Sequence, residues 1–424
     1  MTLCFGLGPM RRLYLALWWI LTPVVLGFMA LRWRKGKEHP TRYPERFGVA
    51  SHPRPDGKVI WMHGASVGEV LSLLPLITTI KTHHPDVSVL VTSGTVTSAA
   101  LVEKRLGSTV IHQFLPLDHP LFYHRFLNHW RPDAVYWTES DLWLGLLGAV
   151  KNHALPAFLI NARMSETSYN HWRKVPAFIY RILSTFSVII ACDPIYQGRF
   201  ETLSGQRVLL TPDLKYDSPP PPFSEDQRQA LQSILGTSTL WMAASTHDPE
   251  EAMILTVHQR LRQDIPTLRL ILAPRHPHRR EDIKALAERQ GLSLAMRSHN
   301  DEFMGKDVYL IDTMGEMDLF YSLCPLVFVG GSLIPHGGQN VFEPARHGCA
   351  VLHGPHMDNF PRMCSDLGDG LVAVSDQQDL YARLRNLLLN PKHLAQQQEK
   401  ARRNAAHLRG AAAMIYERTH TLWP

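Results

Sequence analysis

The sequence predicts an α/β protein with two Rossmann-like, doubly wound parallel sheets, preceded by a hydrophobic helix. Three observations carry this prediction: short apolar runs that alternate with helical patterns, a proline run between two such series, and an uncharged stretch near the N-terminus. Each apolar run ends in small or polar residues, as strands do at the ligand-binding edge of a parallel sheet. At 424 residues and 45% hydrophobic composition, the chain is long enough for two or three domains.

The stretch from Leu13 to Leu31 is uncharged and about as long as the 20 or so residues that a helix needs to cross a bilayer. Two arginines precede it and a larger basic group follows, so the positive-inside bias favours a cytoplasmic body. A signal peptide is the alternative, but the run is long for one and no small-residue cleavage site precedes the basic group. Its tryptophans and Pro23 leave open a helix that lies in the membrane interface. Residues 1–38 are assigned to an N-terminal membrane anchor.

The first series of predicted strands begins at Val59–His63, which a glycine-containing loop and a helical pattern follow. Further apolar runs lie at 87–92, 134–137, 157–160 and 187–191. Each is followed by polar residues and then by a helical pattern, which is typical of βαβ units. Residues 39–217 are therefore predicted to form the first Rossmann-like domain.

Four consecutive prolines in Ser218–Pro222 form a stiff extended segment, which predicts a domain boundary. The second series has apolar runs at 239–243, 268–273, 308–311, 326–329 and 350–352. An amphipathic helical pattern then runs from about residue 380 to residue 422. Residues 218–424 are predicted to form the second Rossmann-like domain, with terminal helices.

The stretch Leu326–His347 combines a predicted strand, a glycine loop and a helix start. Gly330 and Gly331 allow a sharp turn that is expected to leave amide N–H groups free. Free N–H groups beside the positive end of a helix dipole would attract an anion. Alternatively, Asn340 and Glu343 form a capping box and the glycines only make turns.

Net charge, cysteine content and motifs limit the classes of partner and cofactor that the sequence predicts. The formal charge of +6 suggests an anionic surface or substrate, but the basic residues are spread along the chain and no nucleic-acid-binding motif occurs. The five cysteines share no C-x-x-C spacing, which argues against a disulfide framework or a zinc site and favours a reducing compartment. His276 and His278 lack an obvious third ligand, and no D-x-D motif follows a strand, so no metal is expected.

Eight motifs appear in one order along the chain: HGASVGE (63–69), TESDLW (138–143), NARMS (161–165), LKYD (214–217), ASTH (244–247), PRHP (274–277), DTMGE (312–316) and GGSLIPHGGQNVFEPA (330–345). Together with the hydrophobic leader, they closely resemble the 3-deoxy-D-manno-octulosonic acid (Kdo) transferases of lipopolysaccharide assembly, glycosyltransferase family 30. The resemblance covers nearly the whole chain. It implies the GT-B fold, in which two Rossmann-like domains face a cleft.

The resemblance implies transfer of Kdo from CMP-Kdo to a lipid A precursor, lipid IVA, at the cytoplasmic face of the inner membrane. Within the motifs, Glu69 takes the position of the proton acceptor, and Glu139 and Lys215 take the transition-state-stabilising positions. An attacking hydroxyl must lose a proton, and a cation favours the departing phosphate. The alternatives are a Glu69 that only complements a helix dipole and a Lys215 that is an exposed linker residue.

Donor binding is implied for a larger set in the second domain. The set consists of Pro274, Arg275, Met314, Gly315, Glu316, Asn340, Val341, Phe342 and Glu343. Arg275 can pair with a phosphate, and the backbone at Gly315 can approach a base closely. A donor with a single phosphate needs no metal if arginine, lysine and helix N-termini neutralise it.

Other functions remain open at this point. A sugar-nucleotide 2-epimerase would share the fold but would not need a membrane anchor, and another membrane-associated glycosyltransferase would share both. An inactive protein that binds a CMP-sugar or lipid A would keep the donor motifs without a base, and Glu69 argues against it.

Overall fold

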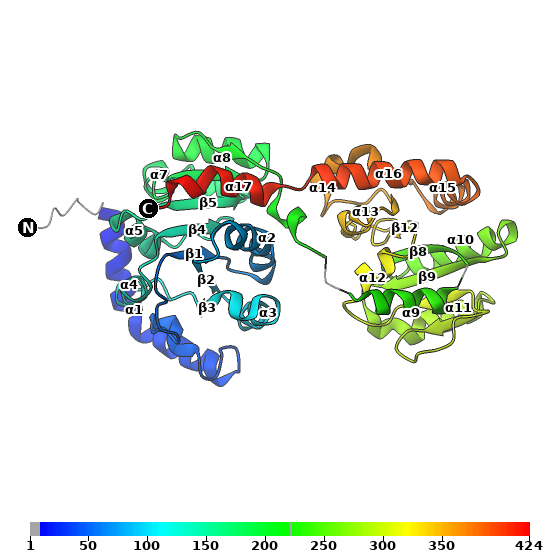
Figure 1. Ribbon diagram of the computed structural model, residues 1–424, viewed down its shortest axis with the longest axis horizontal. Helices are drawn as coiled ribbons and strands as arrows, with labels where there is room; N and C mark the ends of the chain where they lie inside the picture. The colour runs from blue at the N-terminus through cyan, green and yellow to red at the C-terminus, as the bar shows by residue number, and fades with distance from the viewer. Residues whose placement is uncertain (1–8, 221–222, 237) are drawn as a thin grey trace, which may run out of the picture. The chain divides into compact units, whose positions relative to one another are not determined.

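The computed structural model describes residues 9–220, 223–236 and 238–424. It divides into two compact units, Met1–Ser218 with Arg409–Pro424, and Pro219–Leu408. Each unit is a parallel sheet covered by helices (Figure 1). Pro221 and Pro222 of the predicted linker lie outside the described residues.

The first unit contains a seven-stranded parallel sheet in the order β3-β2-β1-β4-β5-β6-β7. Its strands are β1 Val59–His63, β2 Ser88–Ser93, β3 Ile111–Phe114, β4 Ala134–Thr138, β5 Ala157–Ala162, β6 Val188–Ala191 and β7 Leu209–Leu210. Its α-helices are α1 Pro9–Arg34, α2 Val67–His83, α3 Val96–Leu106, α4 Pro120–Trp130, α5 Leu144–Asn152, α6 Glu166–Trp172, α7 Pro176–Leu183, α8 Pro194–Ser204 and α17 Ala411–Thr419.

Alternate residues of β1 face the two sides of this sheet. Val59 and Trp61 pack with α4, α5, α7 and α8, whereas Ile60 and Met62 pack with α2, α3 and α17. All five residues of β1 are buried. Burial on both faces explains why the inner strands read as continuous apolar runs rather than as alternating patterns.

The second unit repeats the architecture with the strand order β10-β11-β9-β8-β12-β13-β14. Its strands are β8 Thr239–Thr246, β9 Leu268–Pro274, β10 Leu294–Met296, β11 Val308–Leu310, β12 Leu326–Val329, β13 Ala350–His353 and β14 Leu371–Ala373. Its α-helices are α9 Glu225–Leu235, α10 Glu250–Asp264, α11 Arg280–Arg289, α12 Met317–Tyr321, α13 Phe342–Arg346, α14 Pro361–Leu367, α15 Gln377–Leu389 and α16 Pro391–His407.

The predicted α/β class is confirmed, with two parallel sheets. The apolar runs named from the sequence correspond to the inner strands of both sheets. The sequence analysis did not identify the four edge strands, β3, β7, β10 and β14.

The C-terminal segment is helical, as its amphipathic pattern predicts, but its last helix does not lie in the predicted domain. It forms three helices, and the last, α17, belongs to the first unit rather than to a second domain spanning 218–424. Asp217 holds its start, because the carboxylate accepts hydrogen bonds from the backbone N–H groups of Gly410 at 2.6 Å and Ala412 at 2.7 Å. Ile415 and Tyr416 then pack in the core beside α2.

Helix α1 packs one stripe of side chains on the first unit and exposes most of the others. The less exposed positions follow a helical spacing: Tyr14, Trp18, Thr22, Val25, Met29 and Arg32. The Tyr14 hydroxyl donates to Asp118 at 2.7 Å, and Arg32 pairs with Glu38 at 2.7 Å. The helix contains a 19-residue stretch long and apolar enough to cross a membrane, with a mean hydropathy of 1.5. The side of α1 that packs on the first unit is thus held by Tyr14 and Arg32 near the two ends of the helix, while an apolar surface stays exposed.

Candidate functional site

Glu69 lies in the first turn of α2, at the carboxyl edge of the first sheet. Its carboxylate accepts hydrogen bonds from the Ala65 N–H at 2.9 Å, the Ser66 hydroxyl at 2.8 Å and the Thr138 hydroxyl at 3.0 Å. Ser66 also caps α2 by accepting from the Glu69 N–H. Glu69 therefore contributes to the helix start, and the same contacts hold its carboxylate in one orientation where ligands of such sheets bind.

Glu139 follows β4 with a φ of +56°, a left-handed conformation that is costly for a residue with a side chain. Its carboxylate lies 3.0 Å from Lys215 Nζ and 3.4 Å from Arg163 Nε. Arg163 also pairs with Asp213. These four side chains form an ion-pair quartet of two cations and two anions, so Lys215, although its side chain is exposed, is paired with Glu139.

The short segment Leu214–Asp217 that carries Lys215 is anchored from both sides. The Leu214 N–H donates to Asn161 Oδ1 at 3.0 Å, and the Lys215 N–H donates to Asp213 Oδ1 at 3.0 Å. Asn161 is fully buried and has a φ of +48°. The LKYD motif thus places Lys215 at the sheet edge while its last residue anchors α17.

Sequence reasoning did not propose His63 or Asp141 as site residues, although both belong to the quoted motifs. His63 is fully buried, with Nδ1 at 3.0 Å from Thr92 Oγ1 and Nε2 at 3.5 Å from Asp141 Oδ2. Burial acts to raise the pKa of Asp141, but hydrogen bonds from His63 and Trp143 bring that pKa below its ordinary value. A charged carboxylate therefore stands beside the Glu69 loop.

A largely apolar cavity of about 380 Å³ lies between α1 and this edge of the sheet. Its apolar side chains include Trp18, Val25, Phe28 and Met29 of α1. Ala65, whose N–H binds Glu69, also lines it. This apolar cavity thus extends to Ala65, whose N–H binds the Glu69 carboxylate. All of its lining residues belong to the first unit.

The structure contradicts the expectation that the glycine loop of the second unit has free N–H groups. Its N–H groups are not free, because the fully buried Glu250 carboxylate accepts from Gly331 at 2.7 Å, Ser332 at 3.2 Å and Leu333 at 3.0 Å. Burial raises the pKa of Glu250, although these backbone donors act in the opposite direction. The protein's own carboxylate therefore fills the place where the sequence suggested a bound anion, and Glu250 had not been identified as important.

The capping-box alternative is also wrong in its details. The N-cap of α13 is Val341 and makes no side-chain cap, and α13 has only five residues. Asn340 Oδ1 instead accepts from the Phe342 N–H at 2.9 Å, and its Nδ2 donates to Glu343 at 3.1 Å. Burial and the nearby Asp318 raise the pKa of Glu343. The segment 340–343 is thus a loop with a half-buried acid rather than a capped helix start.

The other proposed donor residues lie beyond β9 and β11. Among the described residues, the Arg275 side chain has no hydrogen-bond or ion-pair partner, and Pro274 ends β9 immediately before it. Gly315 has a φ of +85° and open space where a Cβ would point. Met314 is exposed, and Glu316 is held by Arg297 at 2.8 Å. The free guanidinium and the open glycine backbone are therefore available to a ligand.

The proposed residues form two sets. Glu69, Glu139 and Lys215 gather at one edge of the first sheet, and the donor residues belong to the second unit.

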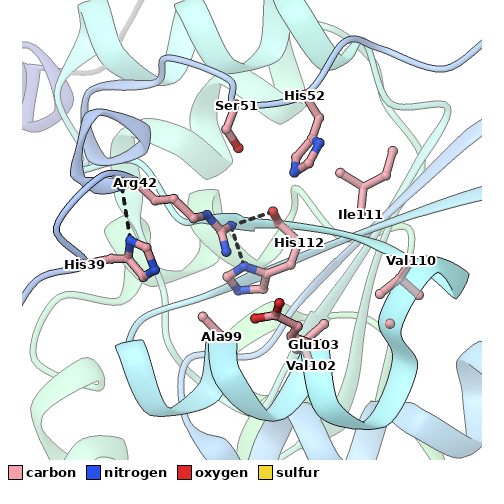
Figure 2. Close-up of a pocket in the computed structure, with 11 residues that line it drawn as sticks. His39, Arg42, Ser51, His52, Ala99, Val102, Glu103, Val110, Ile111 and His112 are labelled. Atoms are coloured by element: carbon pink, nitrogen blue, oxygen red, sulfur yellow. Dashed lines mark hydrogen bonds between the residues drawn. The ribbon is translucent and has the colours of Figure 1, made fainter.

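A separate groove of about 830 Å³ lies in the first unit, between the segment before β1 and α3 (Figure 2). Figure 2 shows Arg42 directed at both the ring and the carbonyl oxygen of His112. Arg42 also pairs with Glu45 at 2.8 Å, and His112 Nε2 lies 2.9 Å from Ser93 Oγ. These polar groups are already paired with one another, so we assign the groove no ligand.

His112 makes the stability of the first unit sensitive to acid. Burial, with Arg42 and Arg46 nearby, lowers its pKa to about 3. The unfolded value is about 6.5, so the unfolded chain binds more protons, and stability falls as the pH drops through 6.5. Between pH 7.5 and 5.5 we expect His112 to account for a loss of about 1.4 kcal/mol. Urea unfolding of wild type and His112→Gln at both pH values measures this, and identical pH dependence in the two proteins would contradict it.

The family model and the sequence relatives that match this chain are described as Kdo transferases. A family model described as 3-deoxy-D-manno-octulosonic-acid transferase (kdotransferase) matches residues 41–218. A probable mitochondrial 3-deoxy-D-manno-octulosonic acid transferase from Arabidopsis thaliana is 34% identical over 407 residues, covering 92% of this chain and 91% of that protein. A 3-deoxy-D-manno-octulosonic acid transferase from Haemophilus influenzae is 34% identical over 397 residues, covering 90% and 91%.

Among solved structures, a UDP-GlcNAc 2-epimerase from Neisseria meningitidis bound to UDP-GlcNAc has a TM-score of 0.59. It covers 85% of this chain and 99% of its own, at 15% identity. A likeness at this identity shows the fold alone.

Proposed function

The chain belongs to the Kdo transferase family of glycosyltransferases, and from this premise we propose that it moves Kdo from CMP-Kdo onto the lipid A precursor lipid IVA. The observation that supports the reaction best is the oriented Glu69 carboxylate, placed at the ligand-binding edge of the first sheet beside an apolar cavity. An epimerase shares the fold, but the sequence relatives that span the chain carry transferase names.

In the proposed reaction Glu69 is the base. As the acceptor hydroxyl attacks the anomeric carbon of Kdo, its proton passes to the Glu69 carboxylate and the bond to the CMP phosphate breaks in a direct displacement. The hydrogen bonds from Ala65, Ser66 and Thr138 hold that carboxylate so that little reorientation is needed.

Lys215 and Glu139 are proposed to stabilise the transition state. Negative charge grows on the departing phosphate, and a positioned ammonium group favours that state. Glu139 and the rest of the ion-pair quartet hold the Lys215 side chain in place. Glu139 therefore acts in this proposal by positioning the lysine.

The acceptor is proposed to place its lipid portion in the apolar cavity under α1. The cavity lies between an apolar helix and the loop that binds Glu69, which suits a substrate with an acyl region and a reactive hydroxyl. We also propose that α1 holds the protein at the inner membrane, with the body on the cytoplasmic side. Its exposed apolar surface and the basic residues that follow it support this location. Sedimentation of the protein with membranes in a fractionated lysate tests the attachment.

No metal is assigned a role in this reaction. Within the described ranges, no group of three or more His, Cys, Asp or Glu side chains is placed to hold a metal ion. Arg275, whose guanidinium has no partner among the described residues, can supply positive charge to a single phosphate. We therefore propose a metal-independent transfer, for which unchanged rates in EDTA are expected.

The function is tested by mass spectrometry of lipid IVA after incubation with CMP-Kdo and the purified protein. The expected product is heavier than lipid IVA by the mass of transferred Kdo. Unchanged lipid would contradict the proposal, and conversion of a sugar nucleotide without transfer would favour the epimerase.

Substitutions in the donor set should weaken binding of CMP. If Arg275 pairs with the phosphate, Arg275→Ala costs roughly 1.5–3 kcal/mol, or about tenfold to a hundredfold in affinity. If Glu343 binds the ribose hydroxyls, Glu343→Gln keeps the shape of the loop and also weakens CMP, with little change in melting temperature. Calorimetric titration measures both, and Arg289→Ala, an exposed arginine of the same unit, serves as the control. Unchanged affinity in both variants would assign the two residues to the scaffold.

A further inference from the structure

Four histidines gather at the carboxyl edge of the second sheet. His247 follows β8, His276 and His278 follow β9, and His336 lies in the loop after β12. The ring centroids of His247 and His336 are 3.8 Å apart, those of His247 and His276 are 5.7 Å apart, and those of His276 and His278 are 5.5 Å apart. We call these four residues the imidazole cluster. From the sequence, two of them had been considered only as unsuitable zinc ligands.

The outer rings of the cluster have unused hydrogen-bonding capacity. In the part of the chain that the structure describes, no hydrogen bond or ion pair involves a ring nitrogen of His276, His278 or His336, and all three residues are exposed. His247 is buried, and its Nε2 lies 3.2 Å from Gln339 Nε2. The cluster therefore consists of the buried His247 ring, which contacts Gln339, and three exposed rings whose nitrogens have no partner among the described residues.

The surroundings of the cluster favour an anion. Arg275 stands between β9 and His276, and its guanidinium has no partner among the described residues. The nearby acids are occupied: Glu250 binds the glycine loop, and Glu251 and Asp248 pair with Arg279. The cluster thus offers N–H donors next to the Arg275 guanidinium, and no carboxylate among the described residues is bonded to the rings.

A neutral His247 ring suits this arrangement. Burial, together with the charges of His336, His276 and Arg275, lowers the pKa of His247 to about 4. An uncharged His247 ring can lie against the His336 ring, from which it is tilted by 37°, without repulsion between two imidazolium rings. A neutral imidazole still donates one N–H, which an acceptor oxygen can take.

The family name defines the transferred sugar as an acid, so the proposed donor carries a carboxylate as well as a phosphate. Building on the proposed function, we propose that the imidazole cluster, with Arg275 beside it, binds the carboxylate of the transferred sugar and selects sugar acids over neutral sugars. Arg275 can then serve the phosphate while the outer imidazoles serve the carboxylate. Specificity of this kind follows because a neutral sugar would leave the donors unpaired.

A packing role is the competing explanation. A Cβ on Gly331 would lie 3.1 Å from a carbon of the His247 ring and 3.4 Å from one of the His336 ring, so the rings cover the glycine loop closely. Replacing an outer histidine with phenylalanine separates the two explanations, because phenylalanine keeps an aromatic ring and removes the N–H donor.

The test uses full-length protein in detergent, with His336→Phe and His276→Phe, and with His299→Phe as a control at an exposed histidine outside the cluster. We expect the KM for CMP-Kdo to rise about tenfold in each cluster variant, while the inhibition constant of CMP changes less than twofold. The control should match wild type. Unchanged KM values, or equal changes for CMP-Kdo and CMP, would overturn the subsite.

A second measurement separates this proposal from the proposed function. Free Kdo and its methyl ester are titrated into the CMP-saturated wild-type protein, and the acid is expected to bind at least tenfold more tightly. Equal binding of acid and ester overturns the subsite even if transfer occurs. Wild-type protein that binds the acid selectively but transfers no Kdo supports the subsite and overturns the proposed function alone.

Discussion

Glu69→Gln is expected to lower the turnover of Kdo transfer by about a hundredfold to ten-thousandfold, while CMP affinity stays within a few-fold of wild type. Glutamine keeps an oxygen that can accept from Ala65 or Ser66, so the start of α2 should remain folded. It cannot take the proton of the attacking hydroxyl. Initial rates with lipid IVA and CMP-Kdo, beside a calorimetric titration with CMP, measure the two quantities separately.

Glu166→Gln is a matched control, because Glu166 also lies in the first turn of a helix of the first unit but is exposed. It should leave the rate unchanged. If Glu69→Gln retained more than a tenth of the wild-type rate, Glu69 would be a helix-start residue and the base would have to be sought elsewhere. A melting curve shows whether the variant is folded under the assay conditions.

Glu250→Ala is expected to cost the second unit about 3–5 kcal/mol of unfolding free energy. The substitution removes the buried carboxylate that accepts hydrogen bonds from Gly331, Ser332 and Leu333 and leaves those backbone donors without partners. Because the same loop leads to Asn340 and Glu343, CMP affinity should fall as well. Urea unfolding and CMP titration give the two effects.

Glu250→Gln should be less damaging, since it keeps one acceptor oxygen but turns an amide NH₂ toward backbone donors. Glu281→Ala, at an exposed glutamate of the same unit, should change stability by less than about 0.5 kcal/mol. A loss below 1 kcal/mol in Glu250→Ala would mean that water or a rearranged loop replaces the carboxylate.

The inner strands of both sheets were predictable because each is buried on two faces and reads as a continuous apolar run. The edge strands β3, β7, β10 and β14 were not predictable from the sequence. β7 has two residues and β10 and β14 have three each, and an edge strand has a sheet neighbour on one side only. A short, partly exposed segment carries too few apolar residues to stand out from a loop.

The candidate site was predictable to a similar extent. The ordered motifs pointed to Glu69, Glu139 and Lys215, and the first unit places all three at one edge of its sheet. They could not show that Glu139 holds Lys215. They also could not show that Glu250, at the start of α10, reaches the glycine loop about 80 residues later, because contacts between residues distant in sequence leave no local pattern.

The sequence by itself determined the α/β class, the inner strands, the apolar N-terminal helix and, through its motifs, the transferase family. These features depend on local spacing and residue type. Tertiary structure alone decided that α17 returns to the first unit, that α1 packs a stripe on the body, that Glu250 occupies the predicted anion site and that four histidines form one cluster. The physical reason is that each of these depends on which distant surfaces bury one another, and side-chain packing and hydrogen-bond satisfaction settle that only once the chain is folded.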